Sequence, residues 1–255
     1  MSGGRYTGAV PASRALIVCD AHLGQAPSPV TAALHRFLDA VPEPSDHLVV
    51  NGDLFDFWFE YRSVVPRAAF PTVSRLAELA RRGVRVTLVG GNHDRWGGAF
   101  WRDEVGAAFH AAEVELSLAG WRTRVAHGDG LTDRHFASRV AHAVTRHPWT
   151  ARVFRWIHPD ASFPLVKRLS RGLAKGSRRE RALQRSADAQ AAYARAELAR
   201  RPDLDLLVLG HTHRAALEAV DRNRWYVNPG AWMDGMRYAV VDERGPRLER
   251  FTSTP

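Results

Sequence analysis

Three short apolar runs alternate with two helical patterns in the first third of the chain, and this order constrains the fold more than any other feature. The runs are Ala15–Cys19, His47–Val50 and Val84–Val89, which are rich in β-branched residues and too short for helices. Between them, apolar residues recur at helical spacing over about 30–41 and 65–82. We therefore predict an α/β protein whose first strands are buried.

The second half of the chain predicts short strands around one long helical stretch. We expect strands at 114–118, 121–126, 204–209, 216–220, 224–227, 237–241 and 248–251. Residues 133–201 show only helical spacing, which prolines and glycines interrupt before a longer helix from about Arg179 to Arg200. We interpret 1–255 as a single domain of α/β (α+β) character, with 133–201 as a helical insertion.

Positive charge dominates the chain, because 36 Lys and Arg face 27 Asp and Glu and give a net charge of +9. Most of the excess lies between Arg152 and Arg185, where ten cations face only Asp160 and Glu180. Such a patch indicates an anionic partner: nucleic acid, a phospholipid surface or a phosphorylated substrate.

The single cysteine excludes a disulfide framework, and the apolar runs near the start are too short for a signal peptide or membrane span. We expect a cytoplasmic protein.

A polar cluster follows each of the first three predicted strands and two later strands. The clusters are Asp20-Ala21-His22, Asn51-Gly52-Asp53, Gly91-Asn92-His93-Asp94, His127-Gly128-Asp129 and Gly210-His211-Thr212-His213. Ligand sites in open α/β sheets lie outside the carboxyl ends of the strands, so we expect these clusters to converge. Carboxylate, amide and imidazole groups together suit first-row divalent ions. The sequence therefore predicts a metal site built from these five segments.

In this order the five segments resemble the signature of the calcineurin-like metallophosphoesterases, and the resemblance extends over about residues 15–232. It implies a metallophosphoesterase β-sandwich core flanked by helices. It also implies two divalent metal ions, about 3.5 to 4 Å apart, that clamp a phosphate and lower the pKa of a bridging water. The ligands it implies are Asp20, His22 and His213 for one ion, Asn92, His127 and His211 for the other, and Asp53 for both.

The same resemblance implies a catalytic role for His93. Its imidazole would meet the charge that develops on the phosphoryl oxygens and the leaving group. Asp94 would orient this ring through a ring N–H, so we expect His93 and Asp94 to form the catalytic pair. The alternative role for His93 is a hydrogen bond that only positions a metal ligand.

A narrower resemblance lies in the segment 52–62, which reads Gly-Asp-Leu-Phe-Asp-Phe-Trp-Phe-Glu-Tyr-Arg, in residues 127–130 and in the basic insertion. These are similar to bacterial UDP-2,3-diacylglucosamine hydrolases of lipid A synthesis. The resemblance implies cleavage of the pyrophosphate of a nucleotide-linked glycolipid into UMP and 2,3-diacylglucosamine 1-phosphate, usually with manganese (Mn²⁺). It places the enzyme peripherally on the anionic inner face of the cell membrane. We expect no nucleic-acid partner, and no obligate protein partner is evident.

This resemblance also implies that the insertion caps the metal site. The insertion has aromatic and aliphatic side chains among its cations, which suit acyl chains and an anionic surface: Phe136, Trp149, Phe154, Trp156, Phe163 and Leu165. Arg62 and Asp129 are candidate substrate contacts, although an ion pair with a nearby carboxylate explains Arg62 equally well. The aromatic residues of segment 52–62 fit either a site or a core, namely Phe55, Phe57, Trp58 and Phe59.

One residue departs from the best-known form of that hydrolase, in which the third segment reads Gly-Asn-Arg-Asp. An arginine there would bind substrate phosphate, whereas His93 would protonate a leaving group. Other phosphoesters therefore stay open as substrates, including a nucleic acid, a cyclic nucleotide or a phosphoprotein. A scaffold that had lost catalysis would lack ligands, and none of the seven is missing.

Overall fold

The larger of two β-sheets combines the first four strands of the chain with the last two. The computed structural model describes residues 12–131, 148–154, 156–158, 160 and 177–252. The order of the six strands is β11-β10-β1-β2-β3-β4. The parallel strands are β1 (Ala15–Val18), β2 (His47–Asn51), β3 (Arg85–Val89) and β4 (Ala108–His110). On the other side of β1, the antiparallel strands are β10 (Arg237–Asp242) and β11 (Gly245–Arg250).

The smaller sheet has five strands in the order β5-β6-β7-β9-β8. Its three central strands are parallel: β6 (Trp121–Ala126), β7 (Leu206–Val208) and β9 (Trp225–Asn228). The two edge strands run antiparallel to their neighbours: β5 (Glu113–Leu118) and β8 (Ala216–Ala219). The turn between β5 and β6 contains Gly120 at φ +91°, a conformation that suits glycine.

The helices agree with the predicted patterns in kind and differ in their bounds. They are α1 (Ser28–Ala40), α2 (Phe70–Arg81), a π-helical turn η1 (Trp101–Val105), α4 (Pro148–Phe154), α6 (Ser177–Arg200) and α7 (Trp232–Gly235). The second helix begins at Phe70 and not near Val65, because Pro66 lies in the predicted first turn and Pro71 suits the start of a helix. The sequence did not indicate β4, η1 or α7.

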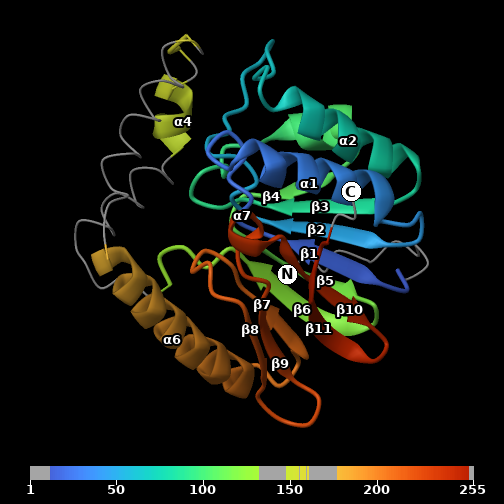
Figure 1. Cartoon of the computed structure of the whole chain (residues 1–255), viewed down its shortest axis with the longest axis vertical. Coiled ribbons are helices and arrows are strands. Elements are labelled where there is room, and N and C mark those ends of the chain that lie inside the picture. The colour runs from blue at the N-terminus through green and yellow to red at the C-terminus, as the bar shows by residue number, and fades with distance from the viewer. Residues whose placement is uncertain (1–11, 132–147, 155, 159, 161–176, 253–255) are drawn as a thin grey trace, which may run out of the picture.

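Three apolar clusters define the layers of the molecule. One face of the larger sheet packs against α1 and α2, with Leu16, Leu48 and Val86 pointing to Phe37 and Leu76. Alternate strand residues point to the opposite face, where they meet the smaller sheet: Ala15, Ile17 and Val49 with Val125, Val208 and Val227. The far face of the smaller sheet packs against α6 through Leu207, Tyr226, Ala194 and Leu198. The layers are therefore helices, sheet, sheet and helix α6 (Figure 1), which confirms the predicted fold.

Only part of the predicted insertion is among the described residues. Helices α4 and α6 lie within 133–201, and the helix expected from about Arg179 is α6. Phe136, Phe163 and Leu165 lie outside the described residues. The bounds 133–201 and the single domain 1–255 stay predictions. Among the described helices, none has the length and apolar character that crossing a membrane requires.

Candidate metal centre

All five polar segments follow the carboxyl ends of strands. Three of them follow neighbouring parallel strands of the larger sheet, β1, β2 and β3, and two follow neighbouring parallel strands of the smaller sheet, β6 and β7. Because the two sheets pack face to face, the five segments meet at one end of the sandwich. The topology therefore produces the convergence that the sequence predicts.

The backbone of this region is held in an unusual conformation. Seven described residues other than glycine have a left-handed φ, and five of them are candidate ligands: Asp20, His22, Asp53, His211 and His213. Two glycines allow close packing around them. A side chain on Gly91 would lie 2.1 Å from Asp53 Oδ1, and one on Gly52 would lie 2.3 Å from His127 Nδ1. Backbone strain of this kind persists at sites that the surrounding structure fixes.

The side chains form overlapping clusters of possible metal ligands. The ligand atoms of Asp20, His22 and His213 lie within 4.8 Å of one another, and so do those of Asp53, His127 and His211. A third cluster joins His22, Asp53 and His93. Asp53 therefore lies between the two groups, with its Oδ2 atom 3.7 Å from His22 Nε2 and 3.3 Å from His127 Nε2.

Several buried polar atoms of this site have no hydrogen-bond partner among the described residues, which is rare in folded proteins. They include Asp20 Oδ1, Asn92 Oδ1 and His127 Nε2. In addition, His22 Nε2 and His213 Nε2 face each other at 3.3 Å. Carboxylate oxygen, amide oxygen and imidazole nitrogen with lone pairs to share are the donors that a first-row divalent ion takes. The residues present therefore fit a divalent cation.

Two histidines are oriented by hydrogen bonds on the far side of their rings. His127 Nδ1 donates to the carbonyl oxygen of Asn51 at 3.0 Å, and His213 Nδ1 lies 2.9 Å from Asp234 Oδ2 on α7. These bonds place the ring proton on Nδ1 and leave each Nε2 facing the carboxylates, as in many metal sites. The sequence reasoning missed Asp234, because an isolated aspartate far along the chain carries no motif.

The electrostatics of the site favour a bound cation. Burial would lower the pKa of His127, but Asp53 and Asp20 raise it well above its usual value. Burial would likewise raise the pKa of Asp53, yet His127, His93 and His22 bring it well below its usual value. The fully buried carboxylates thus attract positive charge, and a divalent ion would satisfy that attraction.

The expectation that Asp94 orients the ring of His93 is wrong. Both carboxylate oxygens of Asp94 accept backbone N–H groups, from Asp53 at 3.1 Å, Leu54 at 2.7 Å and Gly91 at 2.8 Å. The His93 ring is oriented instead by Asp56, whose carbonyl oxygen accepts from Nδ1 at 2.6 Å. Asp94 therefore fixes the loops that carry Asp53 and His93.

His93 lies beside Asp53 and His22, at the edge of the group of candidate metal ligands. Its Nε2 atom is 4.0 Å from Asp53 Oδ2, and its ring lies edge-on to that of His22 with centroids 4.9 Å apart. The carboxylate of Asp56 approaches His93 Nδ1 to 3.8 Å. The sequence does not indicate Asp56 as this partner, because a backbone carbonyl carries no side-chain signal and Asp94 lies next to His93 in the same segment.

The two predicted substrate contacts differ in their surroundings. Asp129 is buried and forms an ion pair with Arg95, which is buried as well. Burial raises the pKa of Asp129, but His127 and Arg95 bring it below its usual value. Arg62 is exposed and forms no ion pair with the described residues. The carboxylate of Asp129 is thus engaged by Arg95, whereas Arg62 is an exposed residue.

The aromatic residues of segment 52–62 divide between the core and a contact with α4. Phe55 and Trp58 are buried, stack on each other at 5.2 Å and pack in the core beside Trp101. Phe57 and Phe59 lie 5.6 and 5.2 Å from the ring of Phe154, which also lies parallel to Trp96 at 6.4 Å. Helix α4 is therefore attached to the loops that follow β2 and β3.

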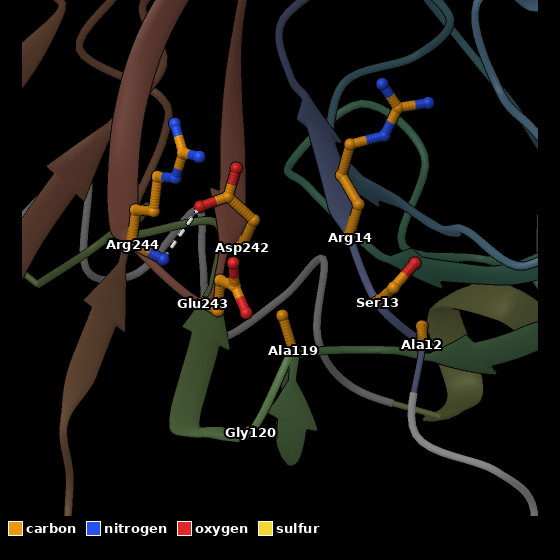
Figure 2. A pocket seen from close by; sticks show the side chains of 8 residues that line it. All are labelled: Ala12, Ser13, Arg14, Ala119, Gly120, Asp242, Glu243 and Arg244. Carbon is orange, nitrogen blue, oxygen red and sulfur yellow. Dashed lines mark hydrogen bonds between the residues drawn. The ribbon is translucent and has the colours of Figure 1, made fainter.

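A shallow hollow elsewhere on the surface is separate from this centre. Figure 2 shows that it is lined by Ala12, Ser13, Arg14, Ala119, Gly120, Asp242, Glu243 and Arg244. Arg14 precedes β1, whereas Asp20 follows it, so the hollow lies at the opposite end of that strand. The hollow contains none of the candidate ligands.

Comparison with known proteins assigns the chain to a family. Residues 14–215 match the family model described as Calcineurin-like phosphoesterase. A Porphyromonas gingivalis protein named UDP-2,3-diacylglucosamine hydrolase is 27% identical over 249 residues, covering 90% of this chain and 94% of its own. The protein of that name from Aeromonas salmonicida is 31% identical over 206 residues, covering 79% and 78%. One from Vibrio cholerae is 25% identical over 205 residues, covering 80% and 83%.

The family match includes every candidate ligand, since it begins before Asp20 and ends after His213. It also covers most of the chain and agrees with the two-sheet fold and with the clusters of possible metal ligands. The chain therefore belongs to the calcineurin-like phosphoesterase family and is an enzyme of that class.

Proposed function

We propose that this enzyme hydrolyses the pyrophosphate of UDP-2,3-diacylglucosamine to UMP and 2,3-diacylglucosamine 1-phosphate. The observation that carries phosphoester hydrolysis is the convergence of carboxylate, amide and imidazole donors at the ends of five strands. The substrate rests on relatives named for this activity, whose matches at 25 to 31% identity span most of the chain.

We assign the metal ligands as the sequence predicts. Asp20, His22 and His213 would hold one divalent ion, Asn92, His127 and His211 the other, and Asp53 both, with Mn²⁺ as the proposed metal. Divalent ions held in this way polarise phosphoryl oxygens and lower the pKa of water. Asp20 Oδ1 and Asn92 Oδ1, which accept no hydrogen bond from the described residues, support this assignment.

We assign proton donation to Nε2 of His93. Nδ1 of this ring donates to the carbonyl oxygen of Asp56, so Nε2 is the atom that faces the clusters. A proton held at Nε2 would pass to the leaving phosphate oxygen as its bond to phosphorus breaks. Asp56 holds the ring in the orientation that this transfer needs, and Asp94 fixes the loops on either side.

The proposed substrate is an anionic lipid, and the described part of the insertion offers a surface that suits it. On α4 and just after it, Trp149, Val153 and Trp156 are exposed, and Trp156 is 91% exposed. Arg62 is exposed on the neighbouring segment that carries Phe59, a contact of α4. We therefore propose a cytoplasmic enzyme that is peripheral on the inner face of the membrane, with Arg62 near the substrate head group.

A second candidate keeps the metal centre and changes the substrate to another phosphodiester or a phosphomonoester. The observation in its favour is His93 itself, which replaces the arginine of the best-known hydrolase of this group. A proton donor at this position serves many leaving groups, whereas an arginine would serve a substrate that carries an additional phosphate.

One assay separates the two candidates. The purified, Mn²⁺-loaded protein is incubated with UDP-2,3-diacylglucosamine in mixed micelles and, in parallel, with a simple chromogenic phosphodiester. We expect release of UMP and the lipid 1-phosphate, with a much higher kcat/KM for the lipid substrate. Cleavage of the simple phosphodiester alone would support the second candidate, and cleavage of neither by metal-loaded protein would contradict both.

A further inference from the structure

Gln190 is a buried amide of α6 that lies against the loop of His211 and His213. Its side chain is 1% exposed. Nε2 donates to the carbonyl oxygen of Gly210 at 3.1 Å, while Oε1 accepts from Tyr226 Oη at 2.9 Å and from Asn228 Nδ2 at 3.0 Å. Two donors on one side fix which way the amide faces. The amide of Gln190 is therefore directed at Gly210.

The peptide group between Gly210 and His211 is held at both ends. Its carbonyl oxygen accepts from Gln190 Nε2 and from Asn228 Nδ2, each at 3.1 Å. Its N–H, which belongs to His211, donates to Asp20 Oδ2 at 3.0 Å. Within the described part of the chain, this leaves Asp20 Oδ1 without a hydrogen-bond partner and close to the histidines of the clusters. The orientation of one peptide plane thus links Gln190 to two candidate ligands.

This peptide needs external support. His211 has a φ of +69° and His213 a φ of +58°, conformations that cost free energy for residues other than glycine. Gly210 also passes close to Asp20, because a side chain there would lie 3.1 Å from Asp20 Oδ2. The hydrogen bonds to the Gly210 carbonyl oppose a rotation of the peptide that would move His211 away from the site.

The same amide also touches the loop of His127. A side chain on Gly128 would lie 2.5 Å from Gln190 Nε2, so the backbone after His127 passes directly against the amide. The N–H of Gly210 donates to the carbonyl oxygen of His127 at 2.9 Å. Gln190 therefore packs on both histidine loops of the smaller sheet.

We infer that Gln190 is a positioning residue for the metal centre and couples α6 to it. This rests on the metal site of the proposed function. Gln190 fixes the Gly210–His211 peptide, and that peptide sets the positions of the His211 imidazole and the Asp20 carboxylate. Because α6 belongs to the predicted insertion, Gln190 is a point at which the insertion meets the metal ligands.

The test compares Gln190→Leu with Leu198→Ala in the full-length protein. Leu198 is buried on α6 and packs on the smaller sheet without belonging to this hydrogen-bond network, so its truncation controls for lost helix packing. The readouts are Mn²⁺ affinity, from the EPR signal of free Mn²⁺, and kcat and KM for a simple phosphodiester. We expect Gln190→Leu to weaken Mn²⁺ binding about 10- to 100-fold, a range typical of groups that orient metal ligands. Leu198→Ala should lower the Tm and bind Mn²⁺ like the wild type.

Equal Mn²⁺ affinity of Gln190→Leu and the wild type would overturn the inference, and so would an equal loss in Leu198→Ala. If Gln190→Leu fails to fold, Tyr226→Phe takes its place, since it removes one donor to Oε1 and keeps the ring. We then expect a smaller loss of Mn²⁺ affinity, and wild-type affinity would overturn the inference. Wild-type protein that binds no Mn²⁺ would instead overturn the metal centre, and failure on the lipid substrate alone would leave this inference standing.

Discussion

Single residues at this site combine backbone strain with dense hydrogen bonding. Asp53 has a left-handed φ, and its backbone N–H donates to Asp94 while its Oδ1 accepts from the His93 N–H at 2.9 Å. A strained residue costs on the order of 1–3 kcal/mol, so such contacts are needed to hold it in place. The shape of the site is therefore set by bonds that need no metal, whereas its charge is balanced only when a cation is bound.

Asp53→Asn separates charge from shape. Asparagine keeps the Oδ1 acceptor for the His93 N–H but removes the negative charge between the two ligand clusters. We expect Mn²⁺ binding and turnover to be lost. In metal-free protein we also expect the Tm to fall at neutral pH, because the contacts with His127, His93 and His22 that hold the pKa of Asp53 well below its usual value are lost. Calorimetric titration with Mn²⁺ and thermal unfolding in a chelator measure the two effects, and turnover close to that of the wild type would contradict the ligand assignment.

The sequence predicted the histidines and carboxylates of the clusters but not the groups that orient them. Asp20, Asp53 and His127 occur in recognisable segments at strand ends, so spacing was sufficient to find them. Asp234 and Gln190 act through hydrogen bonds that form only after distant segments pack together. The orientation of His93 by a backbone carbonyl carries no side-chain signal in the sequence at all.

Strand β2 contains a buried histidine that makes the stability of the larger sheet depend on pH. His47 Nε2 lies 2.8 Å from Thr87 Oγ1 on β3, and His47 Nδ1 has no hydrogen-bond partner in the part of the chain that the structure describes. Burial, and then the charge of Arg85, lowers the pKa of His47 to about 4. The unfolded chain therefore binds a proton at about pH 6.5, whereas the folded protein does not bind it until about pH 4.

The contribution of His47 to stability is thus complete above pH 6.5 and is lost as the pH falls toward 4. The resulting fall in the free energy of unfolding between pH 6.5 and pH 4 is on the order of 3 kcal/mol. We expect His47→Gln to flatten the fall in unfolding free energy between pH 6.5 and 4, because it removes the titrating group. Urea unfolding of both proteins in a chelator measures this. Parallel pH profiles of the two proteins would contradict the prediction.

Phe154 joins helix α4 to aromatic loops beside the metal centre. Phe154 touches Phe57, Phe59 and Trp96. We expect Phe154→Ala to raise KM for the lipid substrate severalfold and to leave kcat/KM for a simple phosphodiester unchanged, since the metal ligands keep their contacts. Phe70→Ala, at an exposed aromatic on α2, is the matched control. Equal losses on both substrates would show that α4 does not act on the lipid part.

At the level of elements, periodicity predicted most strands and the three long helices, because their apolar spacing is a local property. The C-terminal strands join the larger sheet through the antiparallel pairing of β10 with β1. This pairing depends on long-range packing, which the local spacing of apolar residues does not predict. Short elements such as β4, with three half-buried or exposed residues, lack the apolar pattern that a prediction needs.

At the scale of the whole molecule, helices cover the outer face of each sheet and the candidate ligands meet at one end of the sandwich. The chain also carries a net charge of +9, with ten cations between residues 152 and 185. Lysine and arginine near an anionic bilayer each contribute about 1 kcal/mol, and exposed tryptophans favour the interface. Charge and exposed apolar residues therefore occur in the same part of the sequence.

We expect the protein to sediment with vesicles that contain phosphatidylglycerol and not with phosphatidylcholine alone. Binding should weaken as salt rises from 0.1 to 1 M, because the screening length falls from about 10 Å to about 3 Å. Trp156→Ser should reduce sedimentation while cleavage of a simple phosphodiester stays unchanged. Leu217→Ser, at an exposed apolar residue of β8, is the control and should bind like the wild type. Binding that is independent of both salt and Trp156 would contradict a membrane contact through α4.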